Sequence, residues 1–284
     1  MSQPYANLPC PCPVSTATPA WRPASAWLPE ALAHHAVRVL RLRAGAALVL
    51  FDGAGGEYPA TLEIEGKAAW AQLGAHVPRE AELPGRITLV QGLPAGDKMD
   101  WVVEKAVELG AWRVSPIAAQ RSVLQLNGAR AEKRLAHWQR IAQAAAEQCG
   151  RNRLMAVDAP QALAAWLAQA PGAALRLLCH PRPSSIWPAR WRTPRTTTSA
   201  CWWAEGGWSD EELEQARAAG VQRCASPPGA AHRTAGIALI AAVSAIRAGT
   251  ASCEDSIGCM HGSSEPDLRT GIATPPVHSR SPAG

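Results

Sequence analysis

The segment Arg86–Ile117, RITLVQGLPAGDKMDWVVEKAVELGAWRVSPI, decides the fold class of this chain. It predicts a strand at Arg86–Gln91, a helix from the N-cap Asp97 to Leu109 that stops at Gly110, and a strand at Val114–Ile117. The buried face of the helix is predicted from the spacing of Met99, Val102, Val103 and Ala106. A strand, a helix and a second strand in succession are typical of α/β domains, so we expect a largely parallel sheet.

The same alternation continues toward the C-terminus. The predicted elements are a helix at Ala129–Gln148, a strand at Leu175–Cys179, a helix that ends at Gly220, and a helix marked by Ile237, Ile240, Ala241 and Ser244. Ser209 and Glu212 form the Ser-x-x-Glu pattern of a capping box at the start of the third of these. We expect one α/β domain over residues 87–250, and a disordered tail rich in Ser, Gly and Pro over residues 251–284.

The residues before Arg86 have a different pattern. The predicted elements are a helix at Leu28–Leu42 and strands at Ala47–Phe51, Glu57–Ile64 and Trp70–His76. Short strands separated by Gly-containing turns favour a small β-barrel, here residues 1–80, whose first 27 or so residues are atypical. Residues 78–85 are expected to link the two domains.

The composition excludes several classes of protein. The 284 residues are 47% apolar with a net charge of +5, which permits an anionic partner without requiring one. None of the eight cysteines forms a C-x-x-C pair, so no metal site is expected. The N-terminus lacks the pattern of a signal peptide, and no apolar run approaches the roughly 18 residues of a membrane span. We therefore expect a cytoplasmic protein.

Basic residues point to RNA as that partner. One face of the helix at Ala129–Gln148 carries Arg130, Lys133, Arg134, His137 and Arg140. Such a stripe can follow a phosphate backbone, although a solvated helix face has the same pattern. The helix runs into Glu147–Arg153, EQCGRNR, whose arginines can pair with phosphate or stack on a base. Cys149 is interpreted as a small buried apolar residue rather than a nucleophile.

Several motifs in order resemble one family, the small-subunit ribosomal RNA uridine-N3 methyltransferases. Glu147–Arg153 resembles its E-Q-C-G-R motif, and Lys98–Gly110 resembles its K-x-x-x-x-x-x-K-x-x-E-L-G segment. Gln120–Ser122 is similar to its E-R-S segment, and Glu205–Ser209 is similar to the second half of its G-P-E-G-G motif. Leu32–Asp52 resembles the end of its N-terminal domain.

The resemblance implies a fold, a cofactor and a substrate. The expected fold is a PUA-like N-terminal β-barrel domain followed by a SPOUT-type α/β domain with a deep trefoil knot, working as a homodimer. The expected cofactor is S-adenosylmethionine, and the expected substrate is one uridine of 16S rRNA in the small ribosomal subunit. Cofactor-binding residues are expected at Leu178, His180, Glu205, Gly206, Gly207, Thr234, Ala235 and Gly236. RNA-binding residues are expected at Arg38, Arg41, Lys98, Lys105, Arg121, Arg130, Arg134, Arg151 and Arg153.

The chemistry of this reaction agrees with the residues available. N3 of uracil becomes a nucleophile once it loses a proton whose pKa is roughly 9–10, in the range of tyrosine. The methyl group of the cofactor is already activated as a sulfonium, so no covalent enzyme nucleophile is required. We expect Arg151 to stabilise the deprotonated base, with Glu147 as a second candidate catalytic residue.

Two cofactor loops depart from the family pattern. Trp202–Ala204 stands where the family has small residues before Glu205, and residues 228–236 stand where it has R-V-L-R-T-E-T-A-G. Codons for Ala200–Ala204 and for Gly229–Arg233 can encode both missing motifs in a neighbouring reading frame, which would also explain 12 Trp beside only one Phe and two Tyr. The alternative to an active enzyme is therefore an RNA-binding pseudoenzyme, or a frameshifted gene product, that no longer binds the cofactor.

Overall fold

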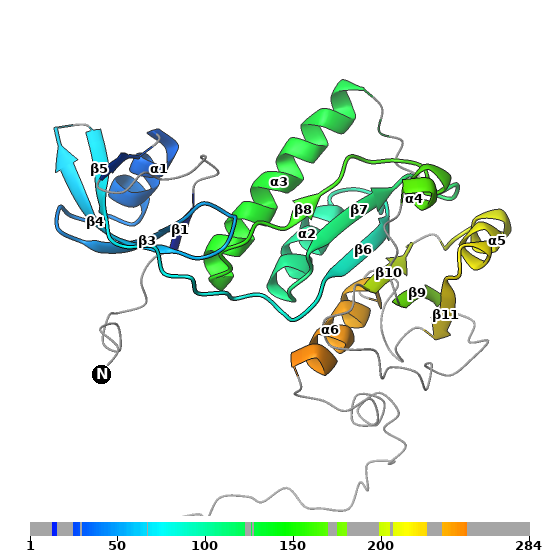
Figure 1. Ribbon diagram of the computed structural model, residues 1–284. Coiled ribbons are helices and arrows are strands. Elements are labelled where there is room, and N and C mark those ends of the chain that lie inside the picture. The colour runs from blue at the N-terminus through cyan, green and yellow to red at the C-terminus, as the bar shows by residue number, and fades with distance from the viewer. Residues whose placement is uncertain are drawn as a thin grey trace, which may run out of the picture.

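The structure of the chain is a computed structural model. It describes residues 13–15, 25–28, 30–66, 68–122, 126, 128–169, 175–180, 199–204, 207–225 and 235–248. They form an N-terminal β-rich domain and a C-terminal α/β domain, joined by an extended linker that runs beside the end of a long helix (Figure 1). The predicted tail at 251–284 lies outside the described residues.

The N-terminal domain is a five-stranded sheet in the order β1-β3-β4-β5-β2, open within the described residues. Its strands are β1 (Pro13–Ser15), β2 (Ser25–Trp27), β3 (Ala47–Phe51), β4 (Tyr58–Glu65) and β5 (Ala68–Leu73). β1 runs parallel to β3, and the other pairs are antiparallel. The helix beside the sheet buries Leu32 and Ala36 against Leu50 and Leu62, so this domain has a core of its own.

This helix differs from the single helix predicted at Leu28–Leu42. It is a short α1 (Glu30–His34) that widens into a π-helical turn, η1 (His35–Val39). The amide of Leu40 donates to the carbonyl of His35, and the left-handed Arg41, with a φ of 55°, ends the helix. The sequence therefore predicted a helix in this region and could not reveal the local change in helix type.

The C-terminal domain is built on six parallel strands in the order β11-β9-β10-β6-β7-β8. The alternating pattern predicted the parallel sheet and three of these strands, whereas β8, β10 and β11 were not predicted. The strands are β6 (Ile87–Gly92), β7 (Arg113–Ile117), β8 (Ala156–Val157), β9 (Leu175–His180), β10 (Ser199–Trp203) and β11 (Gln222–Ala225). Every residue of β6 is buried, which is expected for a central strand covered on both faces.

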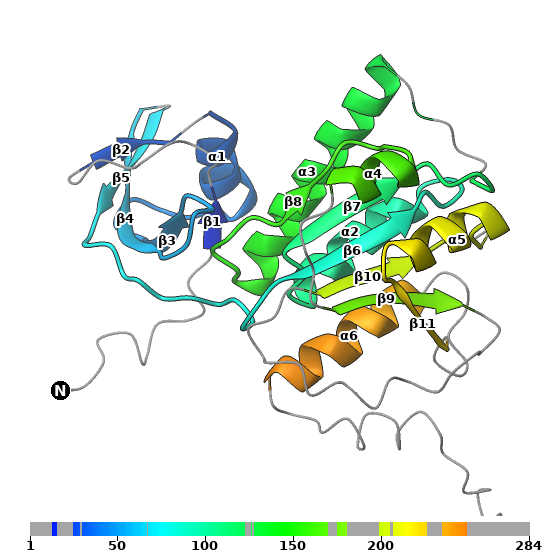
Figure 2. The same ribbon diagram turned by 45° about the vertical axis from the view of Figure 1, so that its right-hand side comes forward.

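Helices cover both faces of this sheet (Figure 2). They are α2 (Lys98–Glu108), α3 (Ala129–Cys149), α4 (Leu163–Gln169), α5 (Asp210–Ala218) and α6 (Ala235–Ala248). Leu89 of β6 packs with α2, α3 and α6 on one face, whereas the next residue, Val90, packs with α4 and α5 on the other. The predicted buried face of α2 is confirmed, since its four apolar residues are at most 3% exposed.

The strand order of the α/β domain contains a crossover. β10 inserts between β6 and β9, although both of these strands precede it in the sequence. The order in which the chain adds strands across the sheet also reverses here. β7 and β8 lie on one side of β6, and the later strands β9, β10 and β11 lie on the other. Such a position is where parallel sheets usually bind ligands. Residues 181–198, between β9 and β10, and residues 226–234, between β11 and α6, lie outside the described residues, and the expected trefoil knot stays a prediction.

Candidate functional site

The carboxyl ends of β6, β9 and β10 meet at one edge of the sheet, since these three strands are adjacent and parallel. Leu178 is buried in β9, and His180 ends that strand. Gly207 follows β10, and Ala235 and Gly236 begin α6, which packs against β6, β9 and β10. The described residues predicted to bind the cofactor therefore gather at this edge.

Glu205, Gly206 and Thr234 lie outside the described residues. Trp203 is the last residue of β10, where its backbone pairs in register with Gln91. The strand therefore forms with tryptophan at the position before the loop.

Gly207 lies directly beside an arginine of another loop. Its backbone is left-handed, with a φ of 74°, a conformation that glycine adopts without strain. A β-carbon at Gly207 would lie 3.8 Å from Nη1 of Arg121, and no closer to any other described residue. Arg121 is exposed and follows β7 in the loop 118–122. The structure thus brings together a predicted cofactor residue and a predicted RNA-binding residue.

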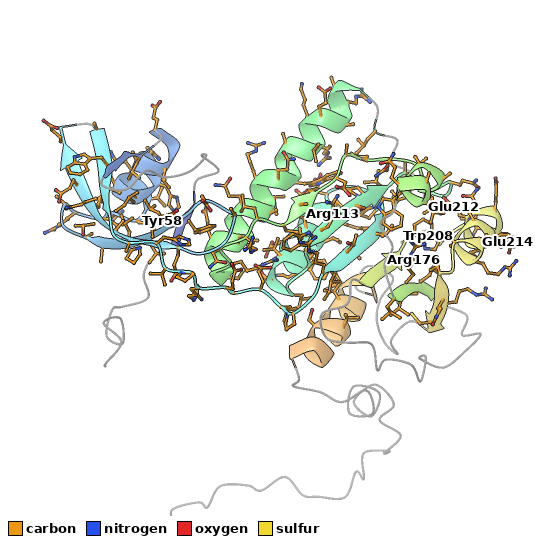
Figure 3. The ribbon with its side chains drawn as sticks, viewed as in Figure 1. Tyr58, Arg113, Arg176, Trp208, Glu212 and Glu214 are labelled. Atoms are coloured by element: carbon orange, nitrogen blue, oxygen red, sulfur yellow. The ribbon has the colours of Figure 1, made fainter. Side chains whose placement is uncertain are left out.

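A buried carboxylate connects these two loops. Glu212, at the start of α5, is only 3% exposed (Figure 3). One carboxylate oxygen accepts the backbone N–H of Gln120 at 2.9 Å, and the other accepts the backbone N–H of Ser209 at 2.9 Å. The Ser209 hydroxyl accepts in turn from the Glu212 amide, so the predicted capping box is confirmed. Glu212 fixes the residue before Arg121 and the segment after Gly207 at the same time.

The basic stripe on α3 divides into two groups. Arg134 donates two hydrogen bonds to Asp97, and His137 pairs with Asp100 at 2.7 Å, so these two residues tie α3 to the start of α2. Asp97 occupies the predicted N-cap position of α2 but makes no side-chain cap. Arg130, like Lys133 and Arg140, is exposed and is the better placed of the predicted residues on α3 for a nucleic acid.

The other predicted RNA-binding residues occupy varied surroundings. Lys105 donates to Glu104 and Glu108, each at 2.8 Å, and these hydrogen bonds raise its pKa. Lys98 is half-buried at the start of α2. Arg38 and Arg41 are exposed on the N-terminal domain. Exposed cations therefore occur on both domains.

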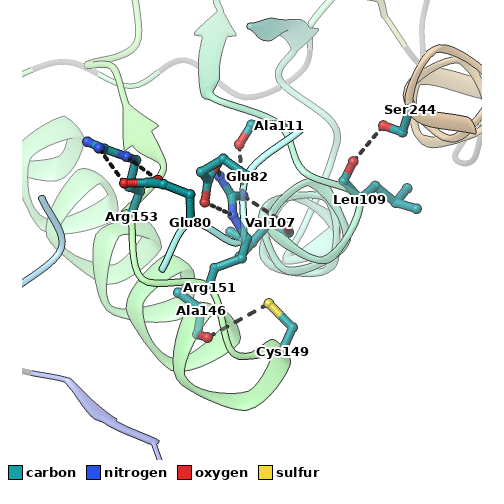
Figure 4. A network of polar contacts seen from close by, with 10 residues as sticks. All are labelled: Glu80, Glu82, Val107, Leu109, Ala111, Ala146, Cys149, Arg151, Arg153 and Ser244. Atoms are coloured by element: carbon teal, nitrogen blue, oxygen red, sulfur yellow. Dashed lines mark hydrogen bonds and ion pairs between the residues drawn. The ribbon is translucent and has the colours of Figure 1, made fainter. Parts of the chain in front are cut away.

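Arg151 lies near the amino ends of β6 and β7, opposite the carboxyl edge, and Figure 4 shows its polar contacts. It is 5% exposed and donates to Glu82 and to the carbonyls of Val107 and Ala111, which all precede the first residues of β6 and β7. The six residues of β6 span roughly 20 Å. Within one chain, Arg151 is thus separated by about a strand length from Gly207, and its catalytic role stays a prediction.

The residues beside Arg151 differ in their exposure. Glu147, half-buried in the last turn of α3, accepts a hydrogen bond from Gln143 at 3.0 Å. Arg153 pairs with Glu80. The interpretation of Cys149 as buried was wrong, because the residue is exposed. Its thiol is nevertheless partly desolvated, which raises the pKa and keeps it in the poorly nucleophilic protonated form.

Two features are absent from the described part of the chain, a cluster of metal-binding residues and a membrane-spanning helix. It contains no group of three or more His, Cys, Asp or Glu residues arranged to hold a metal ion. None of its helices combines the length and the apolar character needed to cross a membrane.

Known sequence families match both domains. A family described as an RNA methyltransferase domain matches residues 81–244. The chain belongs to this family. A second family, described as an RNA methyltransferase PUA domain, matches residues 28–73. As a member of the RNA methyltransferase family, the chain has the predicted architecture of a SPOUT-type α/β domain preceded by a PUA-like domain.

Relatives with this architecture include proteins named ribosomal RNA small subunit methyltransferase E. The one from Synechocystis is 33% identical over 203 residues, which are 70% of this chain and 65% of that protein. The one from Bacillus subtilis is 37% identical over 122 residues, 43% of this chain and 48% of that protein. The chain thus matches less than two thirds of the length of either curated relative.

A solved structure agrees over a longer region. The methyltransferase E of Neisseria gonorrhoeae, crystallised with bound S-adenosylmethionine, is 30% identical to this chain. The two superpose with a TM-score of 0.75 over 83% of this chain and 98% of the gonococcal one.

Sequence reasoning missed three carboxylates. Glu212 was recognised as a helix cap but not as the group that joins two loops of the site. Glu80 and Glu82 were treated only as part of the linker, and their arginine partners lie 73 and 69 residues away. Glu80 and Glu82 are separated by one residue, and in an extended segment this spacing directs both side chains to the same side. It is the one local signal that both could contact the same neighbouring segment.

Proposed function

We propose that this chain transfers the methyl group of S-adenosylmethionine to N3 of a uridine in 16S rRNA of the small ribosomal subunit. The observation that carries the proposal is the placement of Gly207 beside the exposed Arg121 at the carboxyl edge of a sheet in the RNA methyltransferase family. Because the matched region is under two thirds of each curated relative, the activity, substrate and partners are all part of the proposal.

The described residues at this edge fit the cofactor. Leu178, Val90 and Ala204 belong to one buried apolar cluster that packs beneath this edge and supports it. Gly207 lacks a side chain, so a ligand can approach the backbone closely at this position. When bound, S-adenosylmethionine supplies a methyl group already activated on a positively charged sulfur.

The protein's task is then to bind the base, orient it and favour loss of its N3 proton. Arg121 is the cation that the structure places beside Gly207, so it is better located than Arg151 to stabilise the uracil anion. A positive charge near N3 would lower the pKa of that proton toward neutrality. Glu212 holds the Arg121 loop, which keeps the guanidinium at a fixed position relative to the cofactor edge.

The partners follow from the same proposal. Exposed cations on both domains, Arg38 and Arg41 on one and Arg130 on the other, would contact the rRNA backbone. The protein would work in the cytoplasm, where ribosomal subunits are assembled, and as a homodimer like the family that it resembles.

The test is methylation of small subunits isolated from cells that lack this modification, with the N3-methyluridine quantified by mass spectrometry. The Arg121→Ala variant should lose at least about tenfold in kcat while cofactor affinity changes little. Arg217→Ala removes an exposed arginine of α5 that pairs with Glu214, and serves as the matched control with unchanged turnover. Equal kcat values for Arg121→Ala and the unmodified protein would exclude the role of Arg121.

Calorimetric titration with S-adenosylmethionine separates the enzyme from the alternative of an RNA-binding pseudoenzyme. Micromolar binding supports the enzyme, whereas absence of binding together with retained rRNA affinity would favour the pseudoenzyme. The comparison is direct because neither measurement requires turnover.

A further inference from the structure

The loop after α3 joins the two domains through its backbone. The amide of Gly55, in a turn of the N-terminal domain, donates to the carbonyl of Asn152 at 3.2 Å. The amide of Leu154 donates back to the carbonyl of Gly53 at 3.1 Å. Arg153 forms isolated β-bridges with Gly53 and Ala54 between these two bonds. A short interdomain β-ladder therefore connects segments about 100 residues apart.

Two arginines of the loop hold the linker by ion pairs (Figure 4). Arg153 donates to both oxygens of Glu80 at 2.8 Å. Arg151 donates to both oxygens of Glu82, at 2.9 and 2.5 Å. Between them, the side-chain amide of Asn152 donates to the carbonyl of Arg79 at 2.6 Å. Each residue of the loop thus binds the linker through its side chain.

The turn of the N-terminal domain leaves space for these contacts. Gly55 has a φ of 107°, and a β-carbon there would collide with the guanidinium of Arg153 and the carboxylate of Glu80. A β-carbon at Gly53 would lie 2.7 Å from Cγ of Leu154. Glycine is favoured at both positions because each backbone has a positive φ, 82° at Gly53 and 107° at Gly55, and the loop also lies close.

We infer that Arg151–Arg153, with Glu80 and Glu82, is an interdomain joint that fixes the PUA-like domain against the methyltransferase domain for RNA binding. The joint is defined by these residues together with Gly53 and Gly55. Arg151 and Arg153 are then positioning residues whose charges are neutralised by the linker, and not ligands of the RNA. The inference rests on the proposed function for its RNA readout.

The joint has a physical consequence for recognition. Exposed cations on the two domains keep one spacing only while the joint is closed. A closed joint means that binding of rRNA does not have to pay for ordering the domains, so affinity is higher than for two mobile domains. Opening the joint should weaken rRNA binding and leave the cofactor edge, at the far end of the strands, unchanged.

The Glu80→Arg variant distinguishes Arg153 as part of a joint from Arg153 as a residue that binds RNA, because the two roles predict opposite changes in rRNA affinity. It places like charges side by side and should open the joint, which we expect to weaken rRNA binding by at least about threefold. If Arg153 bound phosphate directly, the same variant would add positive charge beside a ligand and tighten binding. Glu65→Arg is the matched control, since it makes the same charge change at an exposed end of β4 away from the joint.

Binding is measured with fluorescently labelled 16S rRNA, and cofactor affinity by calorimetry on the same preparations. We expect weaker rRNA binding for Glu80→Arg alone, with unchanged cofactor affinity, which shows that the methyltransferase domain remains folded. The double variant Glu80→Arg/Arg153→Glu restores the ion pair in reverse and should recover most of the lost affinity. Binding of Glu80→Arg that equals or exceeds that of Glu65→Arg would overturn the inference.

Hydrogen exchange gives a readout that needs neither RNA nor cofactor. The amides of Gly55 and Leu154 should exchange several-fold faster in Glu80→Arg and return to the original rate in the double variant. Unchanged exchange at both amides would show that no joint opens. Failure of the proposed function would instead appear as absent cofactor or rRNA binding in the unmodified protein, with the exchange result unaffected.

Discussion

At Arg151 the guanidinium donates four hydrogen bonds within the protein, two to Glu82 and two to backbone carbonyls. The sequence showed an arginine after a glycine at the end of a basic helix, a pattern equally suited to binding phosphate. It could not show that a carboxylate 69 residues earlier would meet this side chain. The type of residue was therefore predictable and its partner was not, because long-range pairing leaves no local pattern in the chain.

Arg151→Ala should destabilise the protein by about 3–5 kcal/mol, since it leaves the buried Glu82 carboxylate and two carbonyls without their donor. The free energy of unfolding, from urea titration, checks this. Arg151→Lys should lose less, because lysine keeps the charge but not the planar fork. A loss below about 1 kcal/mol for Arg151→Ala would contradict the structural role.

The pH dependence of the joint follows from Glu80. Its hydrogen bond from Arg153 lowers the pKa of the Glu80 carboxyl, while Glu80 first, then the charges of Glu82 and Asp52, raise the pKa of Arg153. A lowered folded pKa means that the stabilisation is complete above the ordinary glutamate pKa and is lost as pH falls through the lowered value. The protection factor of the Gly55 amide should therefore decline only in that acidic range.

The amide of Leu62, which donates to Ala46 within the N-terminal domain, is the control for this measurement. Its protection should remain when that of Gly55 has declined. Parallel loss at both amides would indicate unfolding of the whole domain instead of opening of the joint.

At the level of elements, the buried face of α2 and the capping box of α5 were predicted correctly, whereas Asp97 makes no side-chain cap at α2. The α2 face and the α5 capping box follow from spacings of three and four residues, which the sequence displays directly. The π-helical end of η1 and the short strands β1 and β2 were missed. These depend on contacts with distant strands, as in the pairing of Trp27 with Trp70, and the local sequence around them has no clear period.

Variants of Ser209 and Glu212 should distinguish an effect on the stability of α5 from an effect on the position of the loop that carries Arg121. Ser209→Ala removes one cap acceptor and should cost about 1 kcal/mol of unfolding free energy. Glu212→Ala also removes the acceptor of the Gln120 amide, so methyl transfer should fall further than stability alone explains. Thermal unfolding and single-turnover methylation are compared on both variants. Equal turnover at matched stability would contradict a positioning role for Glu212.

For the whole molecule, the α/β class and the order of the two domains were predictable from alternating strands and helices. The relative placement of the domains was not, because it depends on the joint. The cofactor edge was only partly predictable: Leu178 and Gly207 gather as expected, while Arg151 lies at the other edge of the sheet. A sequence motif gives the residues of a site without stating at which end of a strand each one lies.

If both domains bind the RNA, the salt dependence of the binding constant should reflect contacts from each domain. Arg38→Ala and Arg130→Ala each remove an exposed cation, and each should reduce the slope of log K against log salt by about 0.7–0.9 if it contacts one phosphate. The double variant should show the sum. Arg217→Ala, on α5, should leave the slope unchanged. A double variant with the slope of one single variant would mean that only one domain contacts the RNA.

The position of β10 also determines how the protein can be made. Its two neighbours in the sheet, β6 and β9, leave the ribosome before it, so each must wait with one edge unpaired until residues 199–203 arrive. Exposed strand edges attract other chains, and pairings distant in sequence form slowly. We expect newly made chains to depend on chaperones, and amides of β10 to be the last in the sheet to gain protection in pulse-labelled refolding. Early protection of β10 would show that the slot between β6 and β9 is never left open.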